Sequence, residues 1–293
     1  MLNAIAVQQG ILVERAEDVF SFSHLTLQEY LTAQYIDDHR QVEKLVTEHL
    51  IDKRWKEVFL LVAGLMRGGA DDLLLLMEKE AQKYINTPKL QALLNWAEQV
   101  TAESPGNFKH VGKRAVAIAN ANVITMTMGK IIGKTISNAY SIADANAIGY
   151  ANANFYVMTN AMAYAINYTN AKANADAIAY AIQYINELED LKIFKNINLI
   201  VLIDQLEKLK AKIPDDKQLK QVHQAFGQYL QQTLLNGFNL TSEMVSLSEE
   251  EAEALGDYLY ANHLIIQCKQ VAVRVSPQTW EAIEARMLLV SND

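Results

Sequence analysis

Apolar side chains recur at spacings of three and four residues over most of this chain, as in the run of Leu199, Leu202, Ile203, Leu206 and Leu209. That spacing places the side chains on one face of an α-helix, where they can be buried against a neighbouring element. Four prolines and 12 glycines are too few for the many tight turns of an all-β protein. Because 51% of the residues are hydrophobic, the chain can bury a sizeable core. The sequence therefore predicts a mainly α fold, a multi-helix bundle or superhelical array.

The first of four stretches, residues 1–36, contains the short sheet that we expect. Two apolar runs, 10–14 and 19–22, are separated by polar residues, which is the pattern of a β-hairpin. A helix should follow, with Thr26 as its N-cap and Glu29 three residues later as its capping-box partner. The segment is therefore expected to be a hairpin followed by a helix.

Amphipathic helices are expected in two further stretches, residues 37–112 and 191–293. Their starts and stops are marked by Gly68–Gly69, Thr87–Pro88, Pro214, Ser248 with Glu251, and Ser276–Pro277. Residues 104–107, Ser-Pro-Gly-Asn, are the best loop and boundary candidate in the chain. The valine-rich residues 269–275 fit either a helix tail or a short strand.

The third stretch, residues 113–190, is an Ala/Asn-rich repeat. From Ala139 to Ala181 every alanine occupies an odd-numbered position, and similar segments recur at intervals of about 14 to 16 residues. Alternation is typical of a strand, yet alanine and asparagine are depleted in strands and alanine is the best helix former. We expect a stack of close-packed helices, with a β-solenoid as the alternative.

Composition excludes several classes of function. The net charge of −8 provides no global basic field to attract nucleic acid or a membrane surface. The apolar runs are shorter than the roughly 20 residues that a membrane span needs, and the first residues lack the features of a secretory leader. A cytoplasmic location is therefore expected. Cys268 is the one cysteine, so a disulfide framework is excluded and a buried apolar thiol is expected.

No catalytic constellation is found in the sequence. Residues 129–135, Gly-Lys-Ile-Ile-Gly-Lys-Thr, approximate a phosphate-binding P-loop, but the first glycine comes one residue too late and no βαβ unit is expected around it. The six histidines lack metal-ligand spacing, so neither a metal site nor a catalytic residue is predicted. The acidic pairs lie at expected helix starts or on exposed faces. An enzyme is therefore not expected from this chain alone.

The string from Phe20 to Ala33 resembles the end of the winged-helix subdomain of NACHT-family signalling NTPases, the STAND-type ATPases that include NOD-like receptors and cyanobacterial defence proteins. The family pattern of Phe-x-His, then Gln-Glu-Phe/Tyr and small residues, is supplied by Phe22, His24, Gln28, Glu29, Tyr30 and Ala33. Residues 257–289, with Val-Arg-Val-Ser and Trp-Glu-Ala-Ile-Glu, also resemble the helical tails of cyanobacterial members.

The resemblance implies that the chain is the C-terminal part of such an NTPase, with the nucleotide-binding module upstream in the same protein. It also implies that His24 is the histidine that reaches the β-phosphate of the bound nucleotide and holds the inactive ADP state; ATP and ADP are thus cofactors of the full-length parent. An imidazole can donate the required hydrogen bond. Gln28, Glu29 and Tyr30 are expected to pack or cap the helix rather than touch ligand.

Two functions follow from these expectations. The first is a sensor or autoregulatory region of a NACHT-type NTPase in bacterial defence or stress signalling, whose trigger is a protein. The second is a free-standing helical scaffold that binds a protein partner through the Ala/Asn-rich repeat, because stacked repeats offer extended binding surfaces.

Overall fold

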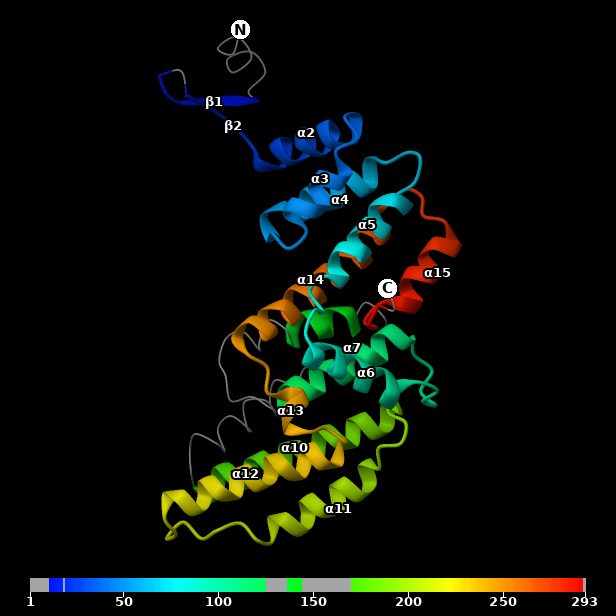
Figure 1. Cartoon of the computed structure of the whole chain (residues 1–293). Helices are drawn as coiled ribbons and strands as arrows, with labels where there is room; N and C mark the ends of the chain where they lie inside the picture. The colour runs from blue at the N-terminus through cyan, green and yellow to red at the C-terminus, as the bar shows by residue number, and fades with distance from the viewer. Residues whose placement is uncertain (1–10, 18, 125–135, 144–169, 292–293) are drawn as a thin grey trace. The chain divides into compact units, whose positions relative to one another are not determined.

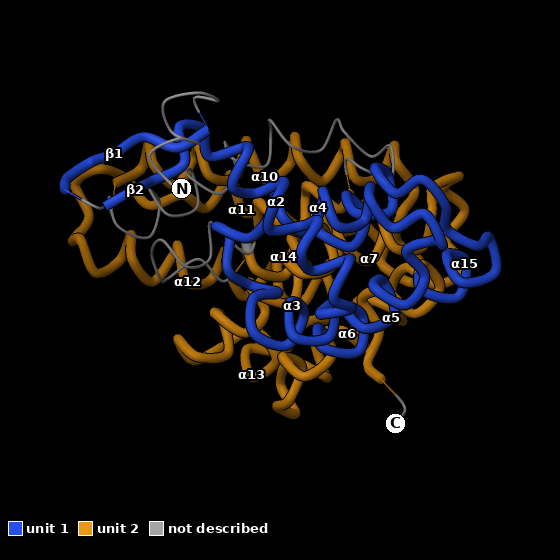
Figure 2. The backbone as a smooth tube through the Cα atoms, turned by 90° about the horizontal axis from the view of Figure 1, so that it is seen from above, with its two compact units in different colours: residues 1–81, 264–283 blue, residues 82–263, 284–293 orange. Residues whose placement is uncertain are grey.

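The computed structural model describes residues 11–17, 19–124, 136–143 and 170–291, and almost all of its regular structure is helical (Figure 1). The predicted mainly α fold is confirmed. Two compact units are distinguished, unit 1 with residues up to 81 and 264–283, and unit 2 with residues 82–263 and those from 284 onward (Figure 2). Much of the Ala/Asn-rich repeat lies outside the described residues, so the choice between helices and a solenoid stays open for that part.

Unit 1 begins with the predicted hairpin, formed by β1 (Leu12–Ala16) and β2 (Val19–Phe22). The strands are antiparallel, with Leu12 opposite Phe22 and an irregularity between Glu14 and Ala16. The hairpin prediction is thereby confirmed.

The helices of unit 1 are α2 (Leu25–Asp38), α3 (Val42–His49), a 3₁₀ turn η1 (Lys53–Trp55), α4 (Lys56–Leu65) and α5 (Asp71–Gln82), joined by the last residues of α14 (Glu249–Val271) and most of α15 (Pro277–Arg286). Helix α2 packs against α4, and Ala33, Ile36, Phe59 and Val62 are buried there. Helices α4 and α5 also bury the apolar face that the three-and-four spacing predicts, with Val58, Val62, Leu73 and Met77 among the buried residues.

The turn before α5 is fixed by backbone contacts within unit 1. Gly69 has φ +111°, a conformation that side-chain-bearing residues rarely adopt. The next amide, that of Ala70, donates to the carbonyl of Arg274 over 2.9 Å. The first three of residues 269–275 end α14, whereas residues 272–275 are neither helix nor strand, so the helix-tail alternative holds for residues 269–271 only.

Asp71 and Ser276 fix the start of α15. The Ser276 amide donates to the two carboxylate oxygens of Asp71 over 3.1 and 3.3 Å, and the Thr279 amide donates to Ser276 Oγ over 3.1 Å. A hydrogen bond from the Thr279 hydroxyl is the main cause that lowers the pKa of the Asp71 carboxyl, and the Ser276 amide adds to it. The predicted N-cap at Ser276 is therefore confirmed, and Asp71 is a partner from far away in the sequence.

Unit 2 is built from α6 (Pro88–Thr101), α7 (His110–Ile124), α10 (Ala171–Leu191), α11 (Leu199–Lys210), α12 (Lys220–Gly237), the short α13 (Ser242–Val245) and the first part of α14. Residues 136–143 are also helical. Helix α6 packs against α7, and α10, α11 and α12 pack against one another. The last residue of α12, Gly237, allows α12 to approach α11 closely, because a Cβ there would lie 2.5 Å from a methyl group of Leu202.

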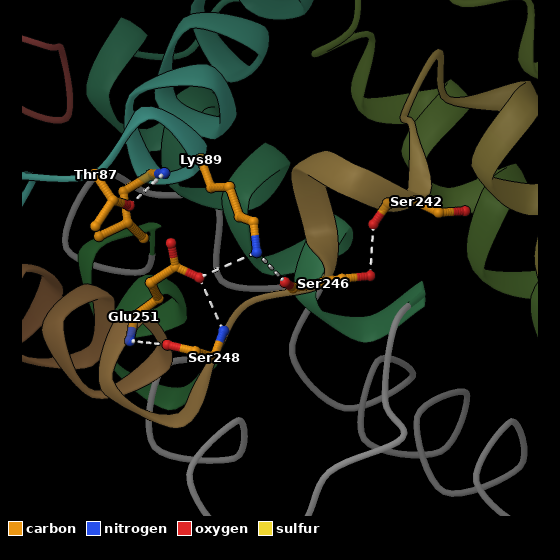
Figure 3. Close-up of polar contacts among 7 residues, drawn as sticks. Thr87, Lys89, Ser242, Ser246, Ser248 and Glu251 are labelled. Carbon is orange, nitrogen blue, oxygen red and sulfur yellow. Dashed lines mark hydrogen bonds and ion pairs between the residues drawn. The ribbon is translucent and has the colours of Figure 1, made fainter.

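The predicted helix starts in unit 2 are confirmed by side-chain hydrogen bonds. Thr87 Oγ1 accepts from the Leu90 amide over 3.4 Å. Ser248 and Glu251 form the predicted capping box, because each side chain accepts from the other's amide, over 3.2 and 2.9 Å (Figure 3). Lys89 Nζ lies 3.5 Å from the same Glu251 carboxylate and donates to the Ser246 carbonyl over 2.9 Å, which links α6 to the start of α14.

The loop of residues 104–107 lies within unit 2. The amide of Gly106 donates to the Lys192 carbonyl over 2.9 Å, and a Cβ at Gly106 would lie 2.4 Å from the Leu191 carbonyl oxygen. A glycine is thus needed for the loop to approach the end of α10. The proposed division of the chain at residues 36, 112 and 190 stays a prediction.

Candidate functional site

His24, the one predicted site residue, lies at the junction of the hairpin and α2. The Ser23 amide donates to the Ile11 carbonyl over 2.8 Å and so extends the strand pairing up to this point. His24 has an extended backbone, with φ −131° and ψ 133°, and is the N-cap of α2. Its carbonyl accepts from the amides of Leu27 and Gln28. The expected cap at Thr26 is therefore wrong: the helix begins at Leu25, and Thr26 and Glu29 form no capping box there.

The imidazole of His24 is exposed at this junction. It makes no capping hydrogen bond to the first turn of α2, and no acidic residue lies in that turn. The amides of a first helical turn carry a partial positive charge, which favours an anion. The arrangement leaves both the imidazole and the end of the helix accessible to a phosphate.

Helix α2 has two apolar faces rather than one. Ala33 and Ile36 are buried, whereas Leu27, Leu31 and Tyr35 recur every four residues along the other side. Tyr35 is 52% exposed and Leu31 41% exposed. A helix that is apolar on more than one side normally has neighbours on both sides. We call Leu27, Leu31 and Tyr35 the outer stripe of α2.

Arg114 is a buried cation that joins three helical segments of unit 2. Arg114 of α7 is 2% exposed, and its guanidinium donates to the Glu98 carboxylate over 3.0 Å and to the carbonyls of Glu284 and Ala285 over 3.5 and 3.2 Å. Burial lowers the pKa of the guanidinium, and the Glu98 carboxylate opposes this effect. The positive charge also caps the last turn of α15, the end of a helix that favours a cation. Arg114 therefore holds α6, α7 and the end of α15 together.

Three more side chains, those of Gln82, Lys109 and Tyr258, hold the C-terminal residues of unit 2. Tyr258 of α14 donates to the Leu289 carbonyl over 3.4 Å, and Gln82 Nε2 lies 3.4 Å from both the Tyr258 hydroxyl and that carbonyl. Burial raises the pKa of the Tyr258 phenol, so it stays a hydrogen-bond donor at neutral pH. Lys109 also pairs with Glu284 over 2.6 Å. These contacts stabilise the fold of unit 2 and do not form a substrate site.

Buried amides and a histidine lie in the core of unit 2. Asn174 Nδ2 lies 3.3 Å from Nδ1 of His223, and both residues are almost fully buried. Asn174 Oδ1, His223 Nε2 and both amide atoms of Asn120 have no hydrogen-bond partner among the described residues. The pairing of Asn174 with His223 could not be predicted from the sequence, because the two residues are 49 positions apart and lie on different helices.

The remaining features considered in the sequence are the P-loop-like segment, metal ligands, Cys268 and membrane spans. The P-loop-like residues 129–135 lie outside the described residues. In the described ranges, no group of three or more histidine, cysteine, aspartate or glutamate side chains is placed to hold a metal ion. Cys268 is buried, as predicted, and burial raises the pKa of its thiol to about 12. Searched over the same ranges, none of the helices combines the length and apolar character of a membrane span.

A shallow depression in unit 2 is also no strong ligand site. Glu189 and residues 196–200 line it, and its volume is about 350 Å³. The one ionisable side chain that lines it, Glu189, is insufficient for paired acid–base catalysis.

Comparison with protein families finds two matches. Residues 1–36 match the winged helix-turn-helix domain C-terminal to NACHT, and residues 202–290 match the NACHT C-terminal helical domain 2. The first match contains His24 and the outer stripe of α2, and the second contains the α15 carbonyls that Arg114 caps. No curated protein and no solved structure matches the chain. Both matched families are domains that follow a NACHT module.

Proposed function

Because the chain is a C-terminal region of the NACHT family, we propose that it is a helical sensor region that regulates the NACHT NTPase module of the same protein. In this proposal the chain does no catalysis itself; the module binds and hydrolyses the nucleotide. The outer stripe of α2 carries the proposal, since two of its three apolar side chains, Leu31 and Tyr35, are exposed within the segment that matches a domain C-terminal to NACHT.

The outer stripe would pack against the NTPase module. Leu31 and Tyr35 are about half exposed, and Leu25 at the start of the same helix is 67% exposed. Covering such side chains contributes roughly 25 cal/mol per Å² of apolar surface removed from water. A contact of this kind couples the state of the module to the position of α2.

His24 would then contribute to the nucleotide site of the module. Its exposed imidazole and the first turn of α2, which carries no acidic residue, both favour a phosphate oxygen. A hydrogen bond to the β-phosphate of ADP stabilises the arrangement in which α2 is docked. His24 is thus a positioning contact of the inactive state and not a general acid or base.

Signalling requires two arrangements of the protein with different affinities for the trigger. A protein trigger that binds the helical region more tightly in the undocked arrangement shifts the population toward it and frees the module. We place this switch in the cytoplasm, in bacterial defence or stress signalling.

The experiment uses the full-length protein with its NTPase module. Tyr35→Asp adds a charge to the outer stripe, and we expect faster basal nucleotide hydrolysis and faster ADP release. His24→Ala should accelerate ADP release while thermal stability of the helical region is unchanged, because the imidazole makes no capping bond. Thr47→Asp, on the exposed side of α3, is the matched control and should behave as wild type.

Two results would overturn the proposal. If deletion of residues 113–293 leaves hydrolysis and its response to stimulus unchanged, the region regulates nothing. If Tyr35→Asp and Thr47→Asp have equal effects on ADP release, the outer stripe does not contact the module.

A further inference from the structure

Helix α12 carries a second exposed row, which lies far from α2 in the sequence. Val222, Ala225, Tyr229, Gln232 and Asn236 follow one another at spacings of three, four, three and four residues, and all five are exposed. Tyr229 is 59% exposed. Such spacing places side chains in a straight seam along one side of a helix, the arrangement by which two helices pack side by side. We call these five residues the α12 seam.

The α12 seam carries no charge. Lys220 is the one Lys, Arg, Asp or Glu residue in the 18 residues of α12. The neighbouring helix α11 differs, because Asp204, Glu207 and Lys208 are exposed on it. Depletion of charge together with an exposed tyrosine is typical of the centre of a protein–protein interface.

The distribution of charge on the chain also indicates which partner covers the α12 seam. The chain has a net charge of −8, so two copies repel each other over most of their surfaces. An uncharged seam adds no repulsion when it meets its own copy. Lys220 stands at the N-terminal end of α12, where the helix dipole disfavours a cation, and no basic residue lies in the last turn. An antiparallel copy would bring its own Lys220 to that negative C-terminal end.

We propose that two copies of this chain pair through α12, with the helices antiparallel about a two-fold axis at Tyr229. Tyr229 is the middle residue of the seam, so each Tyr229 meets its counterpart, and Val222 of one copy lies near Asn236 of the other. The small side chain of Ala225 allows close approach beside Gln232 of the second copy. Gln232 Nε2 donates to Asn236 Oδ1 over 2.9 Å within the seam, and this polar end of the seam fixes the register of the pair.

The pairing goes beyond the proposed regulation of the NTPase module and does not depend on it. Sedimentation equilibrium of the 293-residue chain tests it at several concentrations. We expect a reversible dimer, and a dissociation constant raised by about tenfold or more in Tyr229→Glu, since a charge would lie at the axis against its own copy. Gln205→Glu adds the same charge to the exposed side of α11 and should dimerise as wild type.

Cross-linking distinguishes this geometry from any other dimer. In Tyr229→Cys the two thiols would meet at the axis, and mild oxidation should give a disulfide-linked dimer on non-reducing gels. Buried Cys268 does not compete, and Gln205→Cys should stay unlinked. A wild-type chain that is monomeric at its highest soluble concentration overturns the proposal. So does a dimer that Tyr229→Glu leaves intact or that Tyr229→Cys fails to link.

Discussion

The two compact units bury different kinds of side chain. Among the described residues, every buried polar or charged side chain belongs to unit 2, namely Thr101, Ser104, Lys113, Arg114, Asn120, Asn122, Asn174, His223 and Asn262. The buried positions of unit 1 that the structure describes are apolar, among them Ile36, Phe59 and Leu74. Unit 1 uses its polar groups at helix ends instead, as Asp71 and Ser276 do.

This difference indicates how strongly each unit depends on particular partners. An apolar core is stabilised by the area removed from water and tolerates replacements that keep the volume. A buried polar group costs free energy unless its hydrogen-bond partners are in place. Lys113 is an example, since burial lowers the pKa of its ammonium group and its Nζ donates to the Ser104 carbonyl over 3.0 Å. Replacing one of its buried polar residues should therefore destabilise unit 2 more than a volume-conserving replacement in the core destabilises unit 1.

The largest effect is expected from Arg114→Met. The substitution keeps much of the volume but leaves Glu98 without its cation and the last carbonyls of α15 without a cap, which should cost about 3 kcal/mol. Urea unfolding of the chain measures it, followed by fluorescence of Trp96. That indole is buried in unit 2 and donates to the Phe238 carbonyl over 3.0 Å.

Trp55 and Trp280 belong to unit 1 and are replaced by phenylalanine in this experiment, so that the signal comes from unit 2 alone. Lys109→Met is the control, because it removes only the more exposed ion pair to Glu284 and should cost less than about 1 kcal/mol. Equal losses in the two variants would contradict a special role for the buried cation.

A smaller effect is expected at the buried pair of Asn174 and His223. His223→Leu leaves the polar atoms of Asn174 without a partner and should lower the free energy of unfolding by about 2 kcal/mol. Adding Asn174→Leu should restore most of the loss, because two apolar side chains then replace the pair. A double-mutant cycle with the Trp96 signal measures the coupling. Strict additivity of the two substitutions would show that the pair does not act as a unit.

The apolar cores and most helix ends were predictable because their causes are local. The three-and-four spacing gave the buried faces, and Thr87, Ser248 and Ser276 lie within three residues of the amides or side chains that they pair with. The predicted cap at Thr26 was wrong because a hydrogen bond to a residue outside the helix decides where the helix begins. The bond from Ser23 to Ile11 holds the chain extended up to His24, so the helix begins two residues earlier than the capping-box pattern suggests.

The polar core was not predictable, because its partners come from far away in the sequence. Arg114 lies in a helix whose other residues are mostly alanine, valine and isoleucine, and it meets carbonyls 170 and 171 residues later. The position of Arg114 in its own helix does not indicate which distant carbonyls it will contact. His24 was predicted as a site residue because the segment around it resembles a family motif. The structure adds that it is exposed between a hairpin and a helix.

Unit 1 should tolerate a conservative change in its core. Leu74 is fully buried, and Leu74→Met keeps the volume, so we expect a loss of about 1 kcal/mol. Fluorescence of Trp55 and Trp280 in a Trp96→Phe background measures it. A loss as large as that of Arg114→Met would remove the contrast between the two units.

The smallest effect concerns the polar group that unit 1 uses at a helix end. Asp71→Asn keeps the shape of the side chain but removes the charge that the Ser276 amide and the Thr279 hydroxyl stabilise, and should cost about 0.5 to 1 kcal/mol at pH 7. The folded-state pKa of Asp71 is below its unfolded value, so its contribution is present above about pH 4 and is lost as the pH falls through the folded-state pKa. Unfolding of the variant should therefore lack this part of the acid sensitivity of the wild type. Asp72→Asn, exposed in the same first turn, is the matched control, and an identical pH profile for both variants would show that Asp71 is not a specific cap.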